Sequence, residues 1–144
     1  MNKYLANLSL LNDKPYSSLE KNVNILGTEL VQCPYLNKKV TGYYRNGMCS
    51  TGSIDVGTHI VCALVNDDFL QFTKTKGNDL ITPTSYFPGL VAGDRWCLCI
   101  LRWIESYKEN KAPRIIAEST HKDVEKYIDI NILLQYAITP IKNN

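Results

Sequence analysis

Cys49 has the sequence surroundings best suited to chemistry. It lies within residues 40–57, where glycines recur at intervals of five residues, at Gly42, Gly47, Gly52 and Gly57. Glycine permits positive φ angles and close backbone approach, and the exposed N–H groups of such a loop can bind an anion or an oxyanion. The same donors would favour a thiolate at Cys49. The segment therefore predicts an anion-binding loop with a reactive thiol or, in the simpler interpretation, a hairpin followed by an irregular connection.

The chain has two histidines, His59 and His121, and each stands at the end of an expected strand. A nucleophilic cysteine needs a base within hydrogen-bonding distance. We therefore consider a thiol-dependent enzyme in which His59 or His121 is the base for Cys49. The competing interpretation of a histidine at a strand end is a hydrogen-bonding residue without a catalytic role.

Three polar segments are expected to meet around a cleft: the glycine-rich 42–57 loop, a turn at residues 78–79 and a helix start at residues 94–95. Glycine backbone, arginine side chains and a helix N-terminus would together attract negative charge. The leading hypothesis is a small binding module that holds an anionic small molecule or a thiophilic metal at the 42–57 loop. The candidate ligand-binding residues are Arg45, Asn46, Gly47, Ser50, Thr51, Gly52, Asn78, Asp79, Asp94 and Arg95.

The five cysteines suggest a second kind of site. Cys97 and Cys99 would share one face of a strand but lie about 200° apart on a helix. The sequence has no Cys-x-x-Cys pair of the kind found in structural zinc sites, and we expect free thiols that pack as small hydrophobic residues or act chemically. Cys33 has no expected role. If the side chains converge, the metal-ligand candidates are Cys49, Cys62, Cys97, Cys99, His59 and His121. The third hypothesis is a structural or interaction protein with buried cysteines.

The charge balance argues against two classes of partner. The 16 Lys and Arg residues nearly balance the 14 Asp and Glu residues, and the pI is about 8.2. Nucleic-acid-binding domains usually have a pI above roughly 9 with clustered basic residues, and electrostatic membrane binding needs a polybasic segment. The N-terminal residues lack the continuous apolar stretch of a secretory signal, and an odd number of cysteines without a signal favours a reducing compartment. We expect a cytoplasmic protein that binds neither nucleic acid nor membrane and that could form a homo-oligomer.

The positioning elements follow from the hydrophobic patterns. A continuous apolar run predicts a strand over residues 59–65, and Asn66 and Gly77 are expected to cap a helix over residues 66–76. The spacing of Trp96, Ile100 and Trp103 predicts an amphipathic helix over residues 94–108, although its start could instead be a strand. A further strand is expected over residues 114–118, and Asp129 is expected to cap a final helix.

These elements predict an α+β protein. The expected architecture is a two-layer sandwich in which a small mixed or antiparallel sheet is packed by about three helices. Residues 1–21 are expected to be a loosely ordered lead-in, because they lack a clear periodicity. Residues 22–140 are expected to form a single globular domain.

A further signal comes from a set of short segments: residues 24–27, 41–47, 49–52, 55–63, 77–80, 87–90, 93–99, 102–103 and 117–121. In these segments the sequence resembles the DUF2237 family, an uncharacterised bacterial family that is also seen in some eukaryotes. The resemblance covers about four-fifths of the chain and implies a compact two-layer α+β domain, but it implies no activity, cofactor or catalytic residue. Met48 departs from the family pattern, which often has a second cysteine at this position, and the departure speaks against a vicinal thiol pair or a four-cysteine metal cluster.

Overall fold

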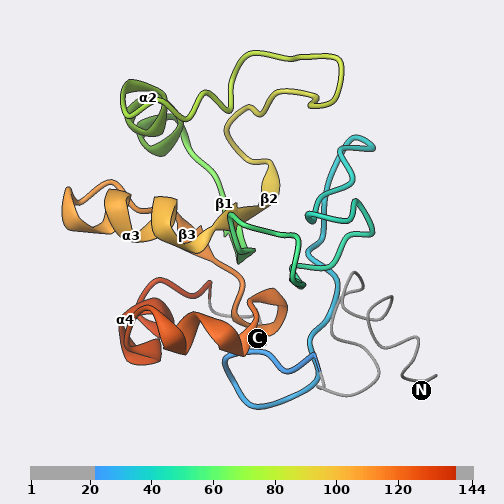
Figure 1. Cartoon of the computed structure of the whole chain (residues 1–144). Coiled ribbons are helices and arrows are strands. Elements are labelled where there is room, and N and C mark those ends of the chain that lie inside the picture. Colours follow the sequence, from blue (N-terminus) through green and yellow to red (C-terminus); the bar gives the residue numbers. More distant parts are fainter. Residues whose placement is uncertain (1–21, 139–144) are drawn as a thin grey trace.

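A three-stranded antiparallel sheet forms the centre of the protein, which we describe from a computed structural model covering residues 22–138. Its strands are β1 (His59–Leu64), β2 (Arg95–Cys99) and β3 (Arg114–Ile115), in the order β2-β1-β3. Within these residues, the sheet and three α-helices make an α+β fold, which confirms the predicted class (Figure 1). The lead-in predicted for residues 1–21 lies outside the described residues.

Strand β1 occupies the middle of the sheet, as its sequence predicts. Its four central residues are all buried, because neighbours cover the strand on both edges and both faces. Such a strand reads as a continuous apolar run rather than an alternating one. The predicted strand over residues 59–65 is therefore confirmed, with its end one residue earlier.

Helix α2 (Asp67–Thr75) follows β1 directly and carries the expected caps. The Asn66 side chain accepts a hydrogen bond from the backbone N–H of Phe69 at 2.8 Å, which satisfies one of the free donors of the first turn. Gly77 follows the helix with a φ of 90°, a conformation that costs other residues a steric penalty. The predicted helix is confirmed at both ends.

The helix predicted over residues 94–108 is wrong in its first part. Residues Arg95–Cys99 form β2, and helix α3 (Ile100–Lys108) begins immediately afterwards. The spacing of apolar residues suits a helix throughout, but pairing with β1 gives the first part backbone partners and buries its three central side chains. Long-range pairing overrides local periodicity here. Asp94 consequently caps no helix and instead accepts a hydrogen bond from the N–H of Val91.

The C-terminal part is built from short elements. Strand β3 ends at Ile115, earlier than the predicted strand over residues 114–118, because two 3₁₀ helices follow: η1 (Ala117–Ser119) and η2 (Lys122–Lys126). Helix α4 (Ile130–Leu134) is capped by Asp129, whose side chain accepts from Asn131 N–H, as predicted. Within residues 22–138, no helix is long and apolar enough to cross a bilayer.

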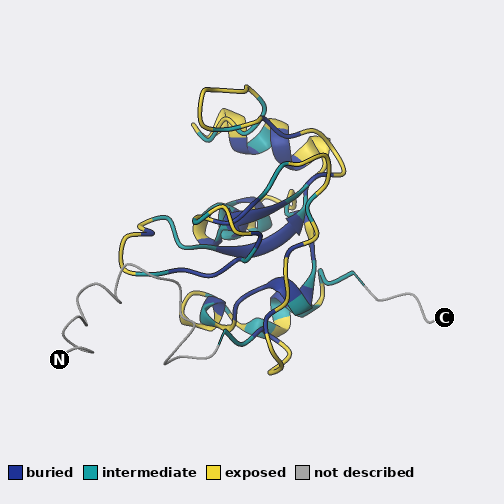
Figure 2. Ribbon diagram, turned by 90° about the vertical axis from the view of Figure 1, so that its right-hand side faces the viewer, coloured by how far each residue is buried: buried dark blue, intermediate teal, exposed yellow. Residues whose placement is uncertain are grey.

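In the described part of the chain, buried side chains form two separate clusters. The larger one is an apolar core between the sheet and the helices, in which Trp103 is completely buried and donates its indole N–H to the carbonyl of Pro113. Figure 2 shows the strands buried and the helices exposed on their outer sides. The smaller cluster contains only cysteines, with Ile116 packed against it: Cys33, Cys49, Cys62 and Cys97.

Candidate functional site

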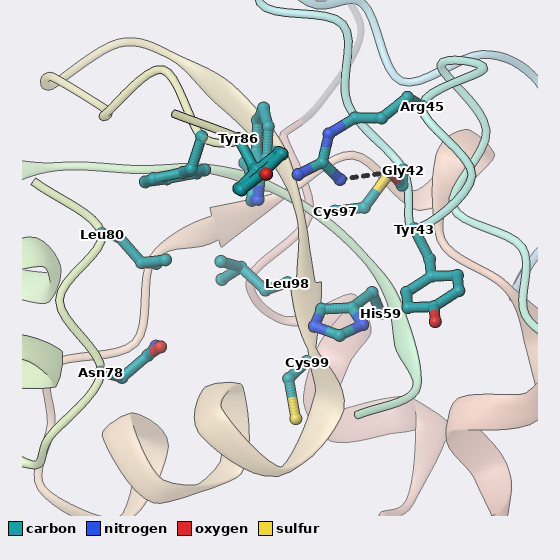
Figure 3. A pocket seen from close by; sticks show the side chains of 12 residues that line it. Gly42, Tyr43, Arg45, His59, Asn78, Leu80, Tyr86, Cys97, Leu98 and Cys99 are labelled. Atoms are coloured by element: carbon teal, nitrogen blue, oxygen red, sulfur yellow. Dashed lines mark hydrogen bonds between the residues drawn. The ribbon is translucent and has the colours of Figure 1, made fainter. Parts of the chain in front are cut away.

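A pocket of about 540 Å³ lies over β2, between two long loops. Figure 3 shows Gly42, Tyr43 and Arg45 on one side and Asn78 and Leu80 on the other, with the end of β2 between them. Its volume falls within the range of about 300–1,000 Å³ usual for small-molecule sites. The lining residues are Gly42, Tyr43, Arg45, His59, Asn78, Leu80, Tyr86, Phe87, Trp96, Cys97, Leu98 and Cys99.

Arg45 supplies positive charge to this pocket. Its guanidinium lies 5.2 Å from the centre of the Trp96 ring and donates a hydrogen bond to the Gly42 carbonyl at 2.8 Å. These two contacts hold the group in place but leave further N–H donors available. In the part of the chain that the structure describes, no Asp or Glu lines the pocket. The lining is therefore suited to an anion.

His59 forms a hydrogen-bonded pair with Asp55. The Nδ1 atom of His59 lies 2.6 Å from Oδ1 of Asp55, and the Asp55 side chain is fully buried. The other oxygen of Asp55 accepts from Thr51 Oγ1 at 3.0 Å and from the His59 backbone N–H at 2.9 Å. Because an ionised carboxylate only accepts, Nδ1 carries the proton of this contact, and Nε2 is the basic nitrogen of the neutral ring. An imidazole oriented in this way can act as a general acid or base.

The ring of His59 is also held by packing. Tyr43 stacks on it, with the ring centres 5.9 Å apart. The backbone of Gly57 lies close to the same imidazole ring. A Cβ atom at position 57 would come within 2.5 Å of His59 Cε1. The absence of a side chain at position 57 therefore makes room for the imidazole.

Cys99 brings a free thiol to the same pocket. It is the register partner of His59 across the β1–β2 pair, and both residues line the cavity. Cys99 is partly exposed, and within residues 22–138 it is the cysteine that has no disulfide partner. Figure 3 shows Cys99 and His59 as neighbours at one end of the pocket.

The other four cysteines are paired. Cys33 is joined to Cys62 and Cys49 to Cys97 in two disulfides, and all four side chains are buried. The free thiols expected from the sequence are thus corrected, except at Cys99. The thiol of Cys49, considered above as a nucleophile, is consumed in a bond, and Cys49 does not line the pocket that contains His59.

His121 is buried away from this pocket. Its Nδ1 accepts a hydrogen bond from the Asp123 N–H at 3.0 Å and thereby caps η2. Burial lowers the pKa of His121, and the nearby Asp123 carboxylate partly opposes this effect. The structure therefore does not bring His121 together with His59 in one pocket.

Two of the ten candidate ligand-binding residues line the pocket, namely Arg45 and Asn78. Four others are engaged within the protein: Asn46 accepts from the Met48 N–H, Thr51 donates to Asp55, Asp94 pairs with Lys39 at 2.7 Å, and Arg95 donates to the Pro34 carbonyl.

The remaining four candidates also lie outside the pocket lining. Gly47 packs against the Gln32 side chain, and the carbonyl of Gly52 accepts from the Asp55 N–H. Ser50 is buried. Asp79 is exposed and accepts from two backbone N–H groups, and hydrogen bonds with Thr82 lower its pKa.

Sequence reasoning missed several residues of the site. Asp55 was not identified as the partner of His59, although an acid four residues away in a glycine-containing turn is a usable signal. Cys33 was given no role, because nothing in its local sequence indicates a partner. The aromatic wall formed by Tyr86, Phe87 and Trp96 was not anticipated, since Trp96 belongs to β2 whereas Tyr86 and Phe87 belong to the loop that precedes it.

Comparison with known proteins agrees with the resemblance stated above. Residues 23–137 match the family described as "Uncharacterized protein conserved in bacteria (DUF2237)". No curated protein matches the chain. The match spans every described helix and strand, from before β1 to beyond α4, and so includes the whole pocket and the cysteine cluster. The chain therefore belongs to the DUF2237 family.

Proposed function

We propose that the protein binds a small anionic molecule with a flat apolar body in the pocket between Arg45 and His59. The observation that carries this proposal is the composition of the lining: Arg45 over Trp96, His59 with its free Nε2, and no acidic side chain from the described residues. An anion would pair with the guanidinium, and the apolar body would pack on the aromatic wall. This proposal keeps the leading hypothesis but moves the ligand from the whole 42–57 loop to its first turn.

The test uses phenylphosphonate as the anionic probe and benzyl alcohol as its neutral counterpart. Binding is followed by the fluorescence of Trp96, with Trp96→Phe identifying the signal against that of Trp103. We expect phenylphosphonate to bind and benzyl alcohol not to bind. Arg45→Gln should weaken binding roughly tenfold or more, because a hydrogen bond to a charged group is worth about 1.5–3 kcal/mol.

Arg114→Gln is the matched control. Arg114 is also exposed and also donates to backbone carbonyls, but it does not line the pocket. Equal affinity of wild type and Arg45→Gln, or equal binding of the two probes, would refute an anion site. Failure of both probes to bind would favour the hypothesis of a structural or interaction protein.

A second candidate function is thiol chemistry at Cys99, with His59 as the base. It is favoured by one observation, the presence of a free thiol and an Asp55-oriented imidazole as cross-strand neighbours in one pocket. This candidate replaces Cys49 by Cys99 in the thiol-enzyme hypothesis. We expect iodoacetamide to alkylate Cys99 faster than it alkylates glutathione, and His59→Gln to remove the difference. An unchanged rate in His59→Gln would exclude His59 as the base.

A further inference from the structure

The four paired cysteines meet at one point although they come from four separate segments. Cys62 and Cys97 face each other across β1 and β2, and each bonds to a loop cysteine, Cys33 or Cys49. The sulfur atoms of Cys33, Cys49 and Cys62 all lie within 4.8 Å of one another, and Cys97 is bonded to Cys49. The two disulfides therefore form one compact cluster of four sulfur atoms.

This arrangement has the dimensions of a tetrathiolate metal site. Zinc binds four cysteine sulfurs tetrahedrally at about 2.3 Å, which places the sulfurs roughly 3.8 Å apart. Three of the sulfurs already lie within 4.8 Å of one another, so small side-chain rotations after reduction could bring the set to this spacing. The cluster forms a compartment of its own, because Ile116 is its packed apolar neighbour and the main core lies elsewhere.

The residue that follows Cys49 in the chain carries a buried polar group that makes no hydrogen bond in the described part of the oxidised protein. The hydroxyl of Ser50, next to Cys49 in the chain, is buried and makes no hydrogen bond within residues 22–138. Buried polar groups usually have partners, and thiolate ligands of metals are usually supported by hydrogen-bond donors. A buried donor without a partner among the described residues, at the position that follows Cys49, fits a state in which this sulfur is a thiolate.

We propose that the reduced protein binds one Zn²⁺ ion through Cys33, Cys49, Cys62 and Cys97, and that the two disulfides are the oxidised form of this site. Each disulfide is reduced by a dithiol, which transfers two electrons and two protons and becomes a disulfide itself. The four thiols then release four protons and bind Zn²⁺ as thiolates, leaving a net charge of −2. In a reducing compartment, where thiols are kept reduced, the metal-bound form would be the resting one.

Zinc and the disulfides would serve the same structural purpose. Both attach the loops that carry Cys33 and Cys49 to the centre of the sheet, and these loops contain no helix or strand of their own. Loss of the metal under oxidising conditions would therefore leave the loops in place. The site would exchange a metal for two covalent bonds without losing the fold.

The first experiment uses the wild-type chain. The protein is reduced with a dithiol, freed of reductant without air, and incubated with Zn²⁺ before alkylation with iodoacetamide and peptide mass spectrometry. We expect one zinc per chain and protection of the four clustered cysteines, while Cys99 is alkylated. Binding of no zinc, or protection of Cys99 in place of one of the four, would overturn the proposal.

Cobalt provides an independent readout of the ligands. Co²⁺ in a tetrahedral thiolate site shows intense visible absorption and sulfur-to-metal charge-transfer bands. We expect these bands in wild type and in Cys99→Ser, the matched control, and their weakening in Cys33→Ser. If the reduced protein unfolds, Zn²⁺ should restore its far-ultraviolet circular dichroism. A reduced chain that zinc does not refold, or bands that depend on Cys99, would contradict the assignment.

Discussion

Removal of the Cys33–Cys62 disulfide tests how much stability the protein gains by attaching the loop that carries Cys33 to strand β1. The bond joins residues separated by 29 positions, and the loop-entropy relation then assigns it about 3.6 kcal/mol of stability. We expect the variant Cys33→Ala/Cys62→Ala to lose about this much free energy of unfolding when oxidised. In a domain of this size, the loss corresponds to a decrease in the melting temperature of roughly 10–18 °C.

The assay is urea unfolding of the oxidised proteins, with Cys99→Ala as the control. Cys99 has no disulfide, so its truncation should cost less than the double substitution. The urea dependence of the unfolding free energy should also rise in the double variant, because an unlinked chain exposes more surface when unfolded. Loss of packing alone would not produce that rise. A double variant within about 1 kcal/mol of the control, with an unchanged urea dependence, would refute the reasoning.

Three further substitutions test particular contacts. Asn24→Ala should lower the free energy of unfolding in urea by roughly 3 kcal/mol, because the buried Asn24 amide donates to two backbone carbonyls and accepts from two backbone N–H groups. Its control is Asn46→Ala, which loses one exposed hydrogen bond and should lower the free energy of unfolding by less than about 1 kcal/mol. His121→Asn should flatten the decline of stability below about pH 6.5, because burial lowers the pKa of His121 in the folded state and the unfolded chain then takes up a proton first. If both proteins lose stability equally between pH 7.5 and 5.5, burial of this imidazole is not the cause. Gly89→Ala should lower the melting temperature more than Gly77→Ala, since both have positive φ but only at position 89 would a Cβ meet a backbone oxygen, at 2.7 Å.

The sequence predicted those elements whose signals are local. Helix α2 was found because Asn66 and Gly77 mark its ends, and β1 because a buried central strand is a continuous apolar run. The strand β2 was mistaken for helix because its identity depends on pairing with a strand more than 30 residues away in the chain. The apolar residues from Trp96 onward do have helical spacing, but this spacing runs across the junction between β2 and α3, which lies between Cys99 and Ile100.

The candidate site was predicted less completely for the same reason. Arg45 was identified because it belongs to an unusual glycine-rich segment, and His59 because it is one of two histidines, each at the end of an expected strand. The disulfides were not, because the partners of Cys33 and Cys49 are 29 and 48 residues away, and spacing alone does not specify connectivity. The departure at Met48 spoke against a four-cysteine metal cluster, and it gave no sign that Cys33 joins the three other cysteines in one buried cluster.

Cys97 belongs both to the pocket and to the cysteine cluster, and we therefore predict that these two sites influence each other. Its sulfur belongs to the cysteine cluster, while the residue also lines the pocket beside Cys99. Reduction of the Cys49–Cys97 bond by a dithiol, with or without subsequent zinc binding, would move a side chain of the pocket wall. We expect the dissociation constant of phenylphosphonate to differ roughly fivefold or more between the oxidised and reduced proteins, the lower range of known couplings between sites. Such coupling is reciprocal. In the reduced protein, phenylphosphonate should therefore change the affinity for zinc by the same factor by which zinc changes the affinity for phenylphosphonate. Equal dissociation constants in the two redox states would show that the wall does not move, and Cys97 would then be a boundary between two independent sites.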